Sequence, residues 1–344
     1  MRLESARSLK EELTSRPAES GLAQSYAVLG AAGLEHRGNV LKTATVSASH
    51  VGPPRGVALG ITPSRRVQGH KLAVRLQSPT PQAHQYAAYV AGKAADEVDV
   101  EFVGPISVGK PAGPSAYTDR IRPLKPGYSV GHYRITAGTI GGFVMDAKKR
   151  LGILSNNHVL ANSNAAKKGD DIVQPGPYDG GKRPDDVIGP LERFVRLKSG
   201  SNAVDVAWAL LDERFRDFDA SYDGKRLASV LAQDDVASSE AVWKIGRTTG
   251  LTRGAVGAIE LDNVAVDYDG TVYSFDGQIE VIGDDGAFSN GGDSGSFIIG
   301  AGNHPLGLLF AGSDKGGPKN TGRTYANVLE VALSLLGLSL APGS

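Results

Sequence analysis

The chain contains no cysteine among its 344 residues. This absence excludes thiolate zinc sites, thiol nucleophiles and disulfides. A chain without disulfides is compatible with a reducing compartment. Basic and acidic residues balance at 37 each, so there is no field of one sign to collect nucleic acid, and we expect no nucleic-acid partner. The length suits two or three units that bury a core by packing alone, and it leaves a homo-oligomer open without requiring one.

Long apolar runs are also missing. No segment has the roughly 18 uninterrupted apolar residues of a membrane-spanning helix, so no membrane contact is predicted. Charges are scattered through residues 1–13, which leaves no apolar core for a secretory signal, and the chain is expected to be cytoplasmic. Since no metal-ligand cluster, phosphate-binding glycine loop or cofactor motif is found, neither a metal nor a cofactor is predicted.

Glycine is abundant, at 45 residues, and it separates short runs of valine, isoleucine, leucine and threonine. That pattern is typical of many short strands joined by turns. Helical periodicity is confined to residues 3–13, 83–93 and 327–336. The chain is therefore predicted to be mainly β.

The sequence divides into three parts. Residues 1–104 are expected to form a small α+β domain, because strand patterns flank the helix at 83–93. These strands are expected at 56–61, 71–76 and 97–103. Residues 105–130 are rich in proline and glycine and are expected to be a linker or a wrapping arm. In residues 131–344 strands alternate with turns, which two packed β-barrels and a C-terminal helix would accommodate.

Acyl transfer to a serine needs a nucleophile, a base, a group that orients the base, and donors for the oxyanion. His158 stands directly after a strand pattern, where a short turn could hold its ring at the mouth of a barrel. Taken alone, such a histidine is more often structural. Asp205 is a single carboxylate in the apolar strand pattern 204–211, so it needs a hydrogen-bond partner such as an imidazole. An aspartate at a strand end, bonded to backbone amides, is the alternative.

Ser294 lies in the segment 290–296, with the sequence NGGDSGS. Its glycines allow a tight turn whose amides point outward, so the amides of Gly292 and Ser294 could bind an oxyanion. A structural turn between two strands is the alternative. The chain order His158, Asp205, Ser294 favours the catalytic interpretation, because Ser-His-Asp sites on other folds use other orders.

Three segments resemble the catalytic blocks of trypsin/chymotrypsin-like serine proteases. They are residues 155–160 (SNNHVL), 204–207 (VDVA) and 292–295 (GDSG). A fourth segment, 246–254 (GRTTGLTRG), looks like the block that opens the second barrel in bacterial members such as the α-lytic type. The resemblance covers residues 133–340 and implies a double β-barrel with the site in the cleft between the barrels.

The same resemblance implies a serine endopeptidase that acts on protein or peptide substrates. His158 would be general base and then general acid, Asp205 its orienting partner, and Ser294 the nucleophile. A narrower resemblance, carried by residues 122–132 and 135–141, is to bacterial proteins related to the plant narrow-leaf protease. It implies an intracellular protease that is preceded by a small N-terminal domain.

The chain also departs from the family pattern. Many extracellular relatives place cysteines beside the histidine and serine blocks, whereas the loops of this chain must be held by packing and hydrogen bonds. In digestive relatives, activation by cleavage creates a new N-terminus, which pairs with the aspartate before the serine. Here a long N-terminal region precedes the protease part, so Asp293 is expected to have another partner, or the site is switched differently.

The resemblance aligns Phe288, Phe310, Ala311 and Gly312 with the walls of the primary specificity pocket. No carboxylate falls at the pocket base, so we expect a preference for apolar or small side chains before the scissile bond. The competing hypothesis is a scaffold or binding module on a protease fold, with the cleft closed. A regulatory variant is that the arm 104–130 lies across the cleft and is moved or cut to switch activity.

Overall fold

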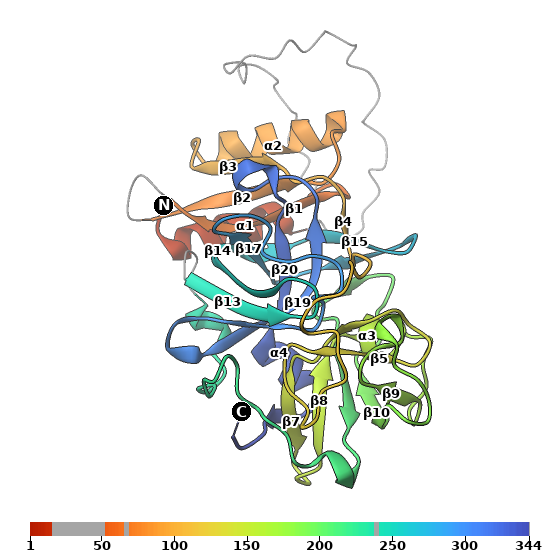
Figure 1. Cartoon of the computed structure of the whole chain (residues 1–344). Helices are drawn as coiled ribbons and strands as arrows, with labels where there is room; N and C mark the ends of the chain where they lie inside the picture. Colours follow the sequence, from red (N-terminus) through yellow and green to blue (C-terminus); the bar gives the residue numbers. More distant parts are fainter. Residues whose placement is uncertain (16–51, 65–68, 237–240, 344) are drawn as a thin grey trace.

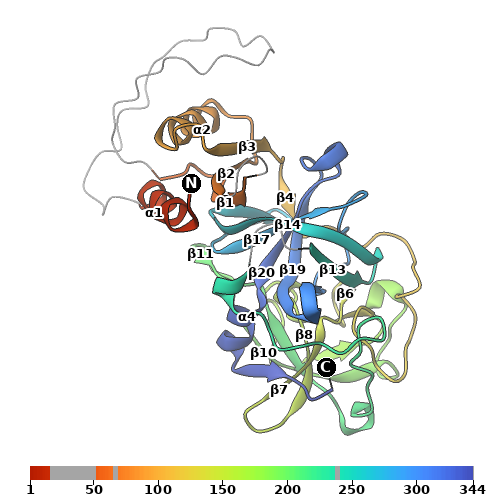
Figure 2. The ribbon, with the colours of Figure 1, turned by 90° about the vertical axis from the view of Figure 1, so that its left-hand side faces the viewer.

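The computed structural model describes residues 1–15, 52–64, 69–236 and 241–343. Its strands form two β-barrels, and a small unit of strands and helices is stacked on the second barrel (Figure 1). Figure 2 shows the same succession of parts from the side. The predicted fold class, a mainly β double barrel preceded by a small α+β unit, is confirmed.

The N-terminal unit has its elements where the sequence pattern predicted them. They are α1 (Leu3–Thr14), β1 (Val57–Pro63), β2 (His70–Leu76), α2 (Pro81–Lys93) and β3 (Val98–Phe102). Thr80 caps α2, because its side-chain oxygen accepts a hydrogen bond from the Ala83 amide at 3.2 Å. The buried faces of both helices pack in one apolar cluster with residues of the second barrel. The unit is therefore fixed to the barrel by a shared core.

A continuous sheet also joins this unit to the second barrel. Strand β1 pairs antiparallel with β14 (Gly250–Asp262), where Ile61 lies opposite Ile259. The sheet runs from β3 through β2 and β1 into the barrel without a break. The boundary near residue 104 stays a prediction, and in the structure no gap in the sheet marks it among the described strands.

The second barrel is a closed ring of six described strands, because each pairs with the next and β18 pairs back to β13. In ring order they are β13 (Ala241–Gly246), β14, β17 (Gln278–Gly283), β20 (Thr324–Val328), β19 (Pro305–Ser313) and β18 (Phe297–Ile299). A hairpin of β15 (Val264–Tyr268) and β16 (Thr271–Phe275) extends this sheet, with β4 (Ile106–Ser107) and β11 (Ser201–Asn202) beside it. The predicted C-terminal helix is α4 (Leu329–Leu336).

The first barrel is half closed, because its eight described strands form a single sheet with two free ends. In sheet order they are β21 (Leu338–Leu340), β7 (Gly142–Asp146), β8 (Leu151–Ser155), β12 (Ala207–Leu210), β10 (Val187–Phe194), β9 (Asp171–Val173), β5 (Ser129–His132) and β6 (Gly138–Thr139). One short helix, α3 (Asn157–Leu160), follows β8. Short 3₁₀ turns lie at Pro177–Asp179, Glu213–Phe215, Gln233–Asp235, Ala301–Asn303 and Pro318–Asn320.

One buried apolar cluster belongs to both barrels. Leu154 and Trp208 of the first barrel pack in it with Ile245, Phe297 and Leu308 of the second. Leu154, Trp208 and Phe297 come from strands that directly precede or follow the predicted catalytic blocks. The shared core therefore fixes the two halves of the candidate site against each other.

A buried group of charges ties the N-terminal unit to the second barrel. Glu280 on β17 receives Arg75 of β2 at 2.9 Å and Arg323 at 2.6 Å, and its side chain is 0% exposed. Arg323 also pairs with Glu101 of β3, whose other oxygen accepts the Gly317 amide at 2.6 Å. Since a buried charge needs a partner, this network holds β2 and β3 to β17 and to the loop after β19.

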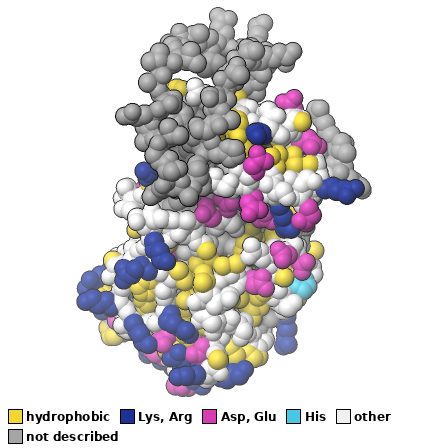
Figure 3. Space-filling model, turned by 180° about the vertical axis from the view of Figure 1, so that it is seen from behind, with side chains coloured by type: hydrophobic (Ala, Val, Ile, Leu, Met, Phe, Trp, Pro, Cys, Tyr) yellow, Lys and Arg dark blue, Asp and Glu magenta, His cyan; other side chains and the backbone are white. Residues whose placement is uncertain are grey.

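The surface carries charges of both signs. On the face seen in Figure 3, acidic and basic side chains are interspersed with apolar ones. No helix in the described part of the chain is both long enough and apolar enough to cross a membrane.

Candidate active site

His158 and Asp205 form a close pair at the edge of the first barrel. His158 lies in α3, directly after β8, and its Nδ1 is 2.5 Å from Asp205 Oδ2. The His158 amide donates to the other carboxylate oxygen of Asp205 at 3.2 Å. Both oxygens of the carboxylate are thus directed at one residue, which fixes the ring and leaves Nε2 to face away from the aspartate.

Asp205 is fully buried, with an exposed fraction of 0%. It lies two residues before β12, so the expectation that it sits inside a strand is wrong. Its amide donates to Asn327 Oδ1 at 2.9 Å, and its carbonyl oxygen accepts Asn156 Nδ2 at 2.7 Å. The strand ladder does not hold this residue, and two asparagine side chains hold it instead.

Tyr268 is a further partner of the carboxylate that sequence reasoning missed. Its hydroxyl donates to Asp205 Oδ2 at 2.7 Å, and its ring meets the His158 ring edge-on, with centroids 5.7 Å apart. Burial, and then the charge of Asp205, raises the pKa of Tyr268 well above its ordinary value, so the phenol keeps its proton. The alternation of Val264, Val266 and Tyr268 in β15 predicts a buried tyrosine that needs a partner, but it does not identify Asp205.

Ser294 lies close to the histidine-bearing helix. A Cβ added to Gly138 would lie 3.0 Å from the Ser294 carbonyl oxygen and would clash with Val159, the residue after His158. The Ser294 hydroxyl donates to the Phe310 carbonyl oxygen at 3.4 Å, and the described residues include no hydrogen bond from it to His158. Such bonds are often long without substrate, so this geometry is compatible with nucleophile and base.

Within the described part of the chain, the amides of Gly292 and Ser294 donate to no protein acceptor. In a trans peptide the N–H points away from the preceding C=O. The Gly291 carbonyl oxygen accepts Thr248 Oγ1 at 2.7 Å, and the Asp293 carbonyl oxygen accepts Ser296 Oγ at 2.7 Å. These donors hold both carbonyl groups, and the Gly291 carbonyl oxygen also accepts the Ala112 amide at 3.3 Å, so the amides of Gly292 and Ser294 point away from these donors. Gly292 has a φ of +97°, which a glycine adopts without strain.

Asp293 has the partner that the sequence left open. Lys244 of β13 lies 3.5 Å from Asp293 Oδ2, and both side chains are 0% exposed. Burial lowers the pKa of Lys244, and the charge of Asp293 opposes that shift. The amides of Thr248 and Thr249 donate to Oδ1 at 2.8 and 3.1 Å. The aspartate before Ser294 is thus held by an internal lysine and by the turn after β13.

The segment 246–254 holds Asp293 and the turn around it in place. Thr248 and Thr249 hold Asp293, and Thr248 also fixes the Gly291 carbonyl. Gly246 gives the aspartate room, because a Cβ there would lie 2.5 Å from Asp293 Oδ1. This block shapes the turn in which Ser294 stands.

The four residues predicted to line a substrate pocket lie on both sides of this turn. The side chains of Phe288 and Phe310 are 2% and 0% exposed and pack into separate apolar clusters. Ala311 is buried and Gly312 is half-buried on β19. Beside them, Ser289 Oγ and Thr324 Oγ1 are 2.6 Å apart. The pocket at these residues stays a prediction.

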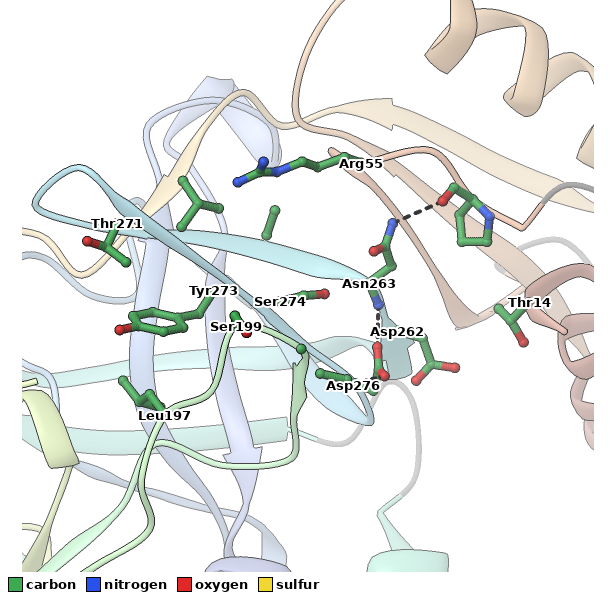
Figure 4. A pocket seen from close by; sticks show the side chains of 15 residues that line it. Thr14, Arg55, Leu197, Ser199, Asp262, Asn263, Thr271, Tyr273, Ser274 and Asp276 are labelled. Atoms are coloured by element: carbon green, nitrogen blue, oxygen red, sulfur yellow. Dashed lines mark hydrogen bonds between the residues drawn. The ribbon is translucent and has the colours of Figure 1, made fainter. Parts of the chain in front are cut away.

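A separate pocket lies between the N-terminal unit and the β15–β16 hairpin. Arg55, Asn263, Tyr273 and Asp276 are among the side chains that line it (Figure 4). Asn263 is fixed there, since its backbone N–H donates to Asp276 Oδ1 at 2.7 Å. None of the predicted catalytic residues lines this pocket. Among the described residues no group of three or more His, Cys, Asp or Glu side chains is placed to hold a metal.

Solved structures similar to this chain are chymotrypsin-like serine proteases. One is a glutamic acid specific serine protease that uses a histidine triad in substrate binding, with 19% identity, a TM-score of 0.47, and coverage of 63% of this chain and 100% of that chain. An alpha-lytic protease homologue, N4, has 17% identity and a TM-score of 0.45 over 63% and 99% of the two chains. Thermobifida fusca protease A has 17% identity and a TM-score of 0.43 over the same shares.

No family model and no curated protein matches the chain. The narrower resemblance to the plant narrow-leaf protease group stays a prediction. At these identities and TM-scores, any function must be argued from the contacts of this chain.

Replacing Tyr268 by phenylalanine should slow any acylation of Ser294 that depends on His158. The variant loses one hydrogen bond to a buried carboxylate, so we expect a rate about ten- to a hundredfold lower. The measurement is the rate at which a fluorophosphonate modifies Ser294, followed across pH. Tyr273→Phe, on the neighbouring strand, is the control and should react at the wild-type rate. A folded Tyr268→Phe protein with an unchanged rate would contradict this role.

Replacing Lys244 by methionine should destabilise the fold. Asp293 would keep only neutral donors in a buried site, and removing one partner of a buried pair costs about 3–5 kcal/mol. Urea unfolding measures the free energy of unfolding. The exposed Lys148→Met variant is the control and should change it by less than about 0.5 kcal/mol. If Lys244→Met were as stable as the control, Lys244 would not be the partner that Asp293 requires.

Proposed function

We propose that this protein is a serine endopeptidase that hydrolyses peptide bonds through an acyl-enzyme. The observation that carries the proposal is the pairing of His158 with a buried Asp205. It is supported by the nearby serine turn, in which the Gly292 and Ser294 amides have no acceptor among the described residues. These are the base, the orienting group, the nucleophile and the oxyanion donors that acyl transfer needs. A purely structural histidine would not need a buried carboxylate held by two asparagines and a tyrosine.

The proposed reaction has two halves. Ser294 Oγ attacks the scissile carbonyl carbon as its proton passes to His158 Nε2, while Asp205 holds the imidazolium through Nδ1–H. The developing oxyanion lies between the amides of Gly292 and Ser294. The C–N bond then breaks as His158 gives its proton to the leaving amine. In the second half, water attacks the acyl carbon as His158 takes one of its protons. His158 then gives a proton to Ser294 Oγ as the acyl C–O bond breaks, which releases the carboxylic acid and restores the serine.

The substrates would be proteins or peptides with an apolar or small residue before the scissile bond. Ser289 and Thr324 supply neutral polar groups near Ala311 and Gly312, and no carboxylate was found at the predicted pocket base. The absence of cysteine supports action in a reducing compartment, and we place the protein in the cytoplasm. Membership of the narrow-leaf group belongs to the same proposal.

A second candidate function is a closed scaffold on a protease fold. It is favoured by the Ser294 hydroxyl, which is bonded to the Phe310 carbonyl and belongs to a residue that is only 5% exposed. The two candidates differ in whether Ser294 can be acylated.

Labelling with a fluorophosphonate probe tests this difference. The wild-type protein should be labelled at Ser294, and Ser294→Ala should not be labelled at all. His158→Ala should react on the order of a thousandfold more slowly, because the base is gone. Ser199→Ala, at an exposed site, is the control and should behave like the wild type. If both the wild type and a Val108→Asp variant, whose arm is loosened, stayed unlabelled, the scaffold would be favoured.

A peptide library tests the substrate preference. We expect cleavage after apolar or small residues, since a neutral pocket cannot balance a buried cation. The measurement is the sequence at the new C-termini, with Ser294→Ala as the blank. Predominant cleavage after lysine or arginine would refute the preference without affecting the assignment of the nucleophile.

A further inference from the structure

The sheet edge next to Ser294 is already occupied by another segment of the chain. β19 passes the nucleophile at Phe310, whose carbonyl accepts the Ser294 hydroxyl. Two residues farther along, β4 pairs antiparallel with β19, and Ser107 lies opposite Gly312. On its other side, β4 pairs with β15, and the Val108 amide donates to the Asp267 carbonyl oxygen at 3.2 Å. β4 is thus a strand inserted between β19 and the β15–β16 hairpin.

Beyond β4, the segment runs along the serine turn. Val108 packs against the apolar cluster that contains Tyr268 and Phe310. A Cβ added to Gly109 would lie 3.1 Å from Gly291 Cα, and one added to Gly291 would clash with the Lys110 carbonyl oxygen. The segment therefore lies in van der Waals contact with the turn that forms the predicted oxyanion site.

The next residues of the arm continue over this turn. A Cβ on Gly292 would lie 3.3 Å from Pro111 Cα, and the Ala112 amide donates to the Gly291 carbonyl oxygen at 3.3 Å. Arg247, which is fully buried, donates to the carbonyl oxygens of Ala112 and Gly113. The arm is therefore held at both ends of its path, by β4 on one side and by Arg247 on the other.

Proteins commonly bind extended peptides by adding them as a strand to a free sheet edge. We propose that residues 106–111 are a built-in peptide ligand that fills the substrate groove, and that a protein substrate is accepted only when this segment leaves. The inference rests on the proposed function, because it assigns that groove to substrate. It also narrows the class of substrate in that proposed function. The groove would take an extended segment with an apolar side chain where Val108 lies and a small residue where Gly109 lies.

An engineered disulfide can lock the segment in place, because the chain has no cysteine of its own. Residues opposite each other in an antiparallel ladder have Cα atoms about 4.5–5.5 Å apart, which suits a disulfide. Ser107→Cys with Gly312→Cys uses such a pair. Gly312 has room for the change, since among the described residues a Cβ there would meet just the Arg323 carbonyl oxygen, at 3.4 Å.

The readout is the rate of hydrolysis of an unfolded protein, β-casein, before and after reduction of the disulfide. We expect the oxidised double-cysteine protein to hydrolyse casein at least about tenfold more slowly than the same protein after reduction, because the disulfide holds the segment in the groove and keeps the substrate-accepting state unpopulated. The two single-cysteine variants are controls and should not respond to reduction. Equal hydrolysis by the oxidised and reduced forms would overturn the proposal.

A binding measurement separates this inference from the proposed function. In Ser294→Ala protein, which does no chemistry, Val108→Asp should loosen the segment by placing a carboxylate against the apolar cluster. The probe is a fluorescent peptide with the sequence of residues 105–112, followed by anisotropy. We expect it to bind the loosened chain at least about tenfold more tightly, because a tethered segment competes at about millimolar effective concentration.

Ala116→Asp, at an exposed position of the arm, is the matched control and should leave binding as in the intact arm. Equal binding to the intact and the loosened chain would refute the built-in ligand. Tighter binding without hydrolysis or probe labelling in any variant that retains Ser294 would support the groove and refute the proposed function.

Discussion

The structure of the candidate site depends on one buried carboxylate. Asp293 has no access to water, so its charge must be met by protein groups, and Lys244 with the Thr248 and Thr249 amides supplies them. These contacts fix the peptide on either side of Asp293. The position of Ser294, the residue that follows Asp293, depends on that anchoring.

Much of the fold could be predicted from the sequence, because the signals of its strands and helices are local. Alternating apolar residues and glycine-rich turns mark the strands, and the helices α1, α2 and α4 follow a period of 3.6 residues. The chain order of His158, Asp205 and Ser294 was sufficient to propose that they meet, and the structure brings His158 onto Asp205. The need of Asp293 for an internal partner could also be foreseen from the chemistry of its charge.

The rest depends on contacts between distant segments, which local patterns do not encode. Tyr268 reaches Asp205 only through the register of a hairpin, and β4 finds β19 across some two hundred residues of sequence. The side chains of Phe288 and Phe310 are buried in apolar clusters, which depends on strand alternation and sheet position. The sequence pattern likewise did not predict that Asp205 lies just before β12 and is held there by two asparagine side chains.

The shared sheet makes the N-terminal unit part of the same folded body as the second barrel. Its strand β1 covers the edge of β14, and Arg75 supplies half of the positive charge around the buried Glu280. A chain shortened to the two barrels would present an uncovered strand edge together with a poorly compensated charge, a combination that promotes aggregation. The two barrels and the N-terminal unit would thus be expected to be inherited, exchanged and engineered as one piece.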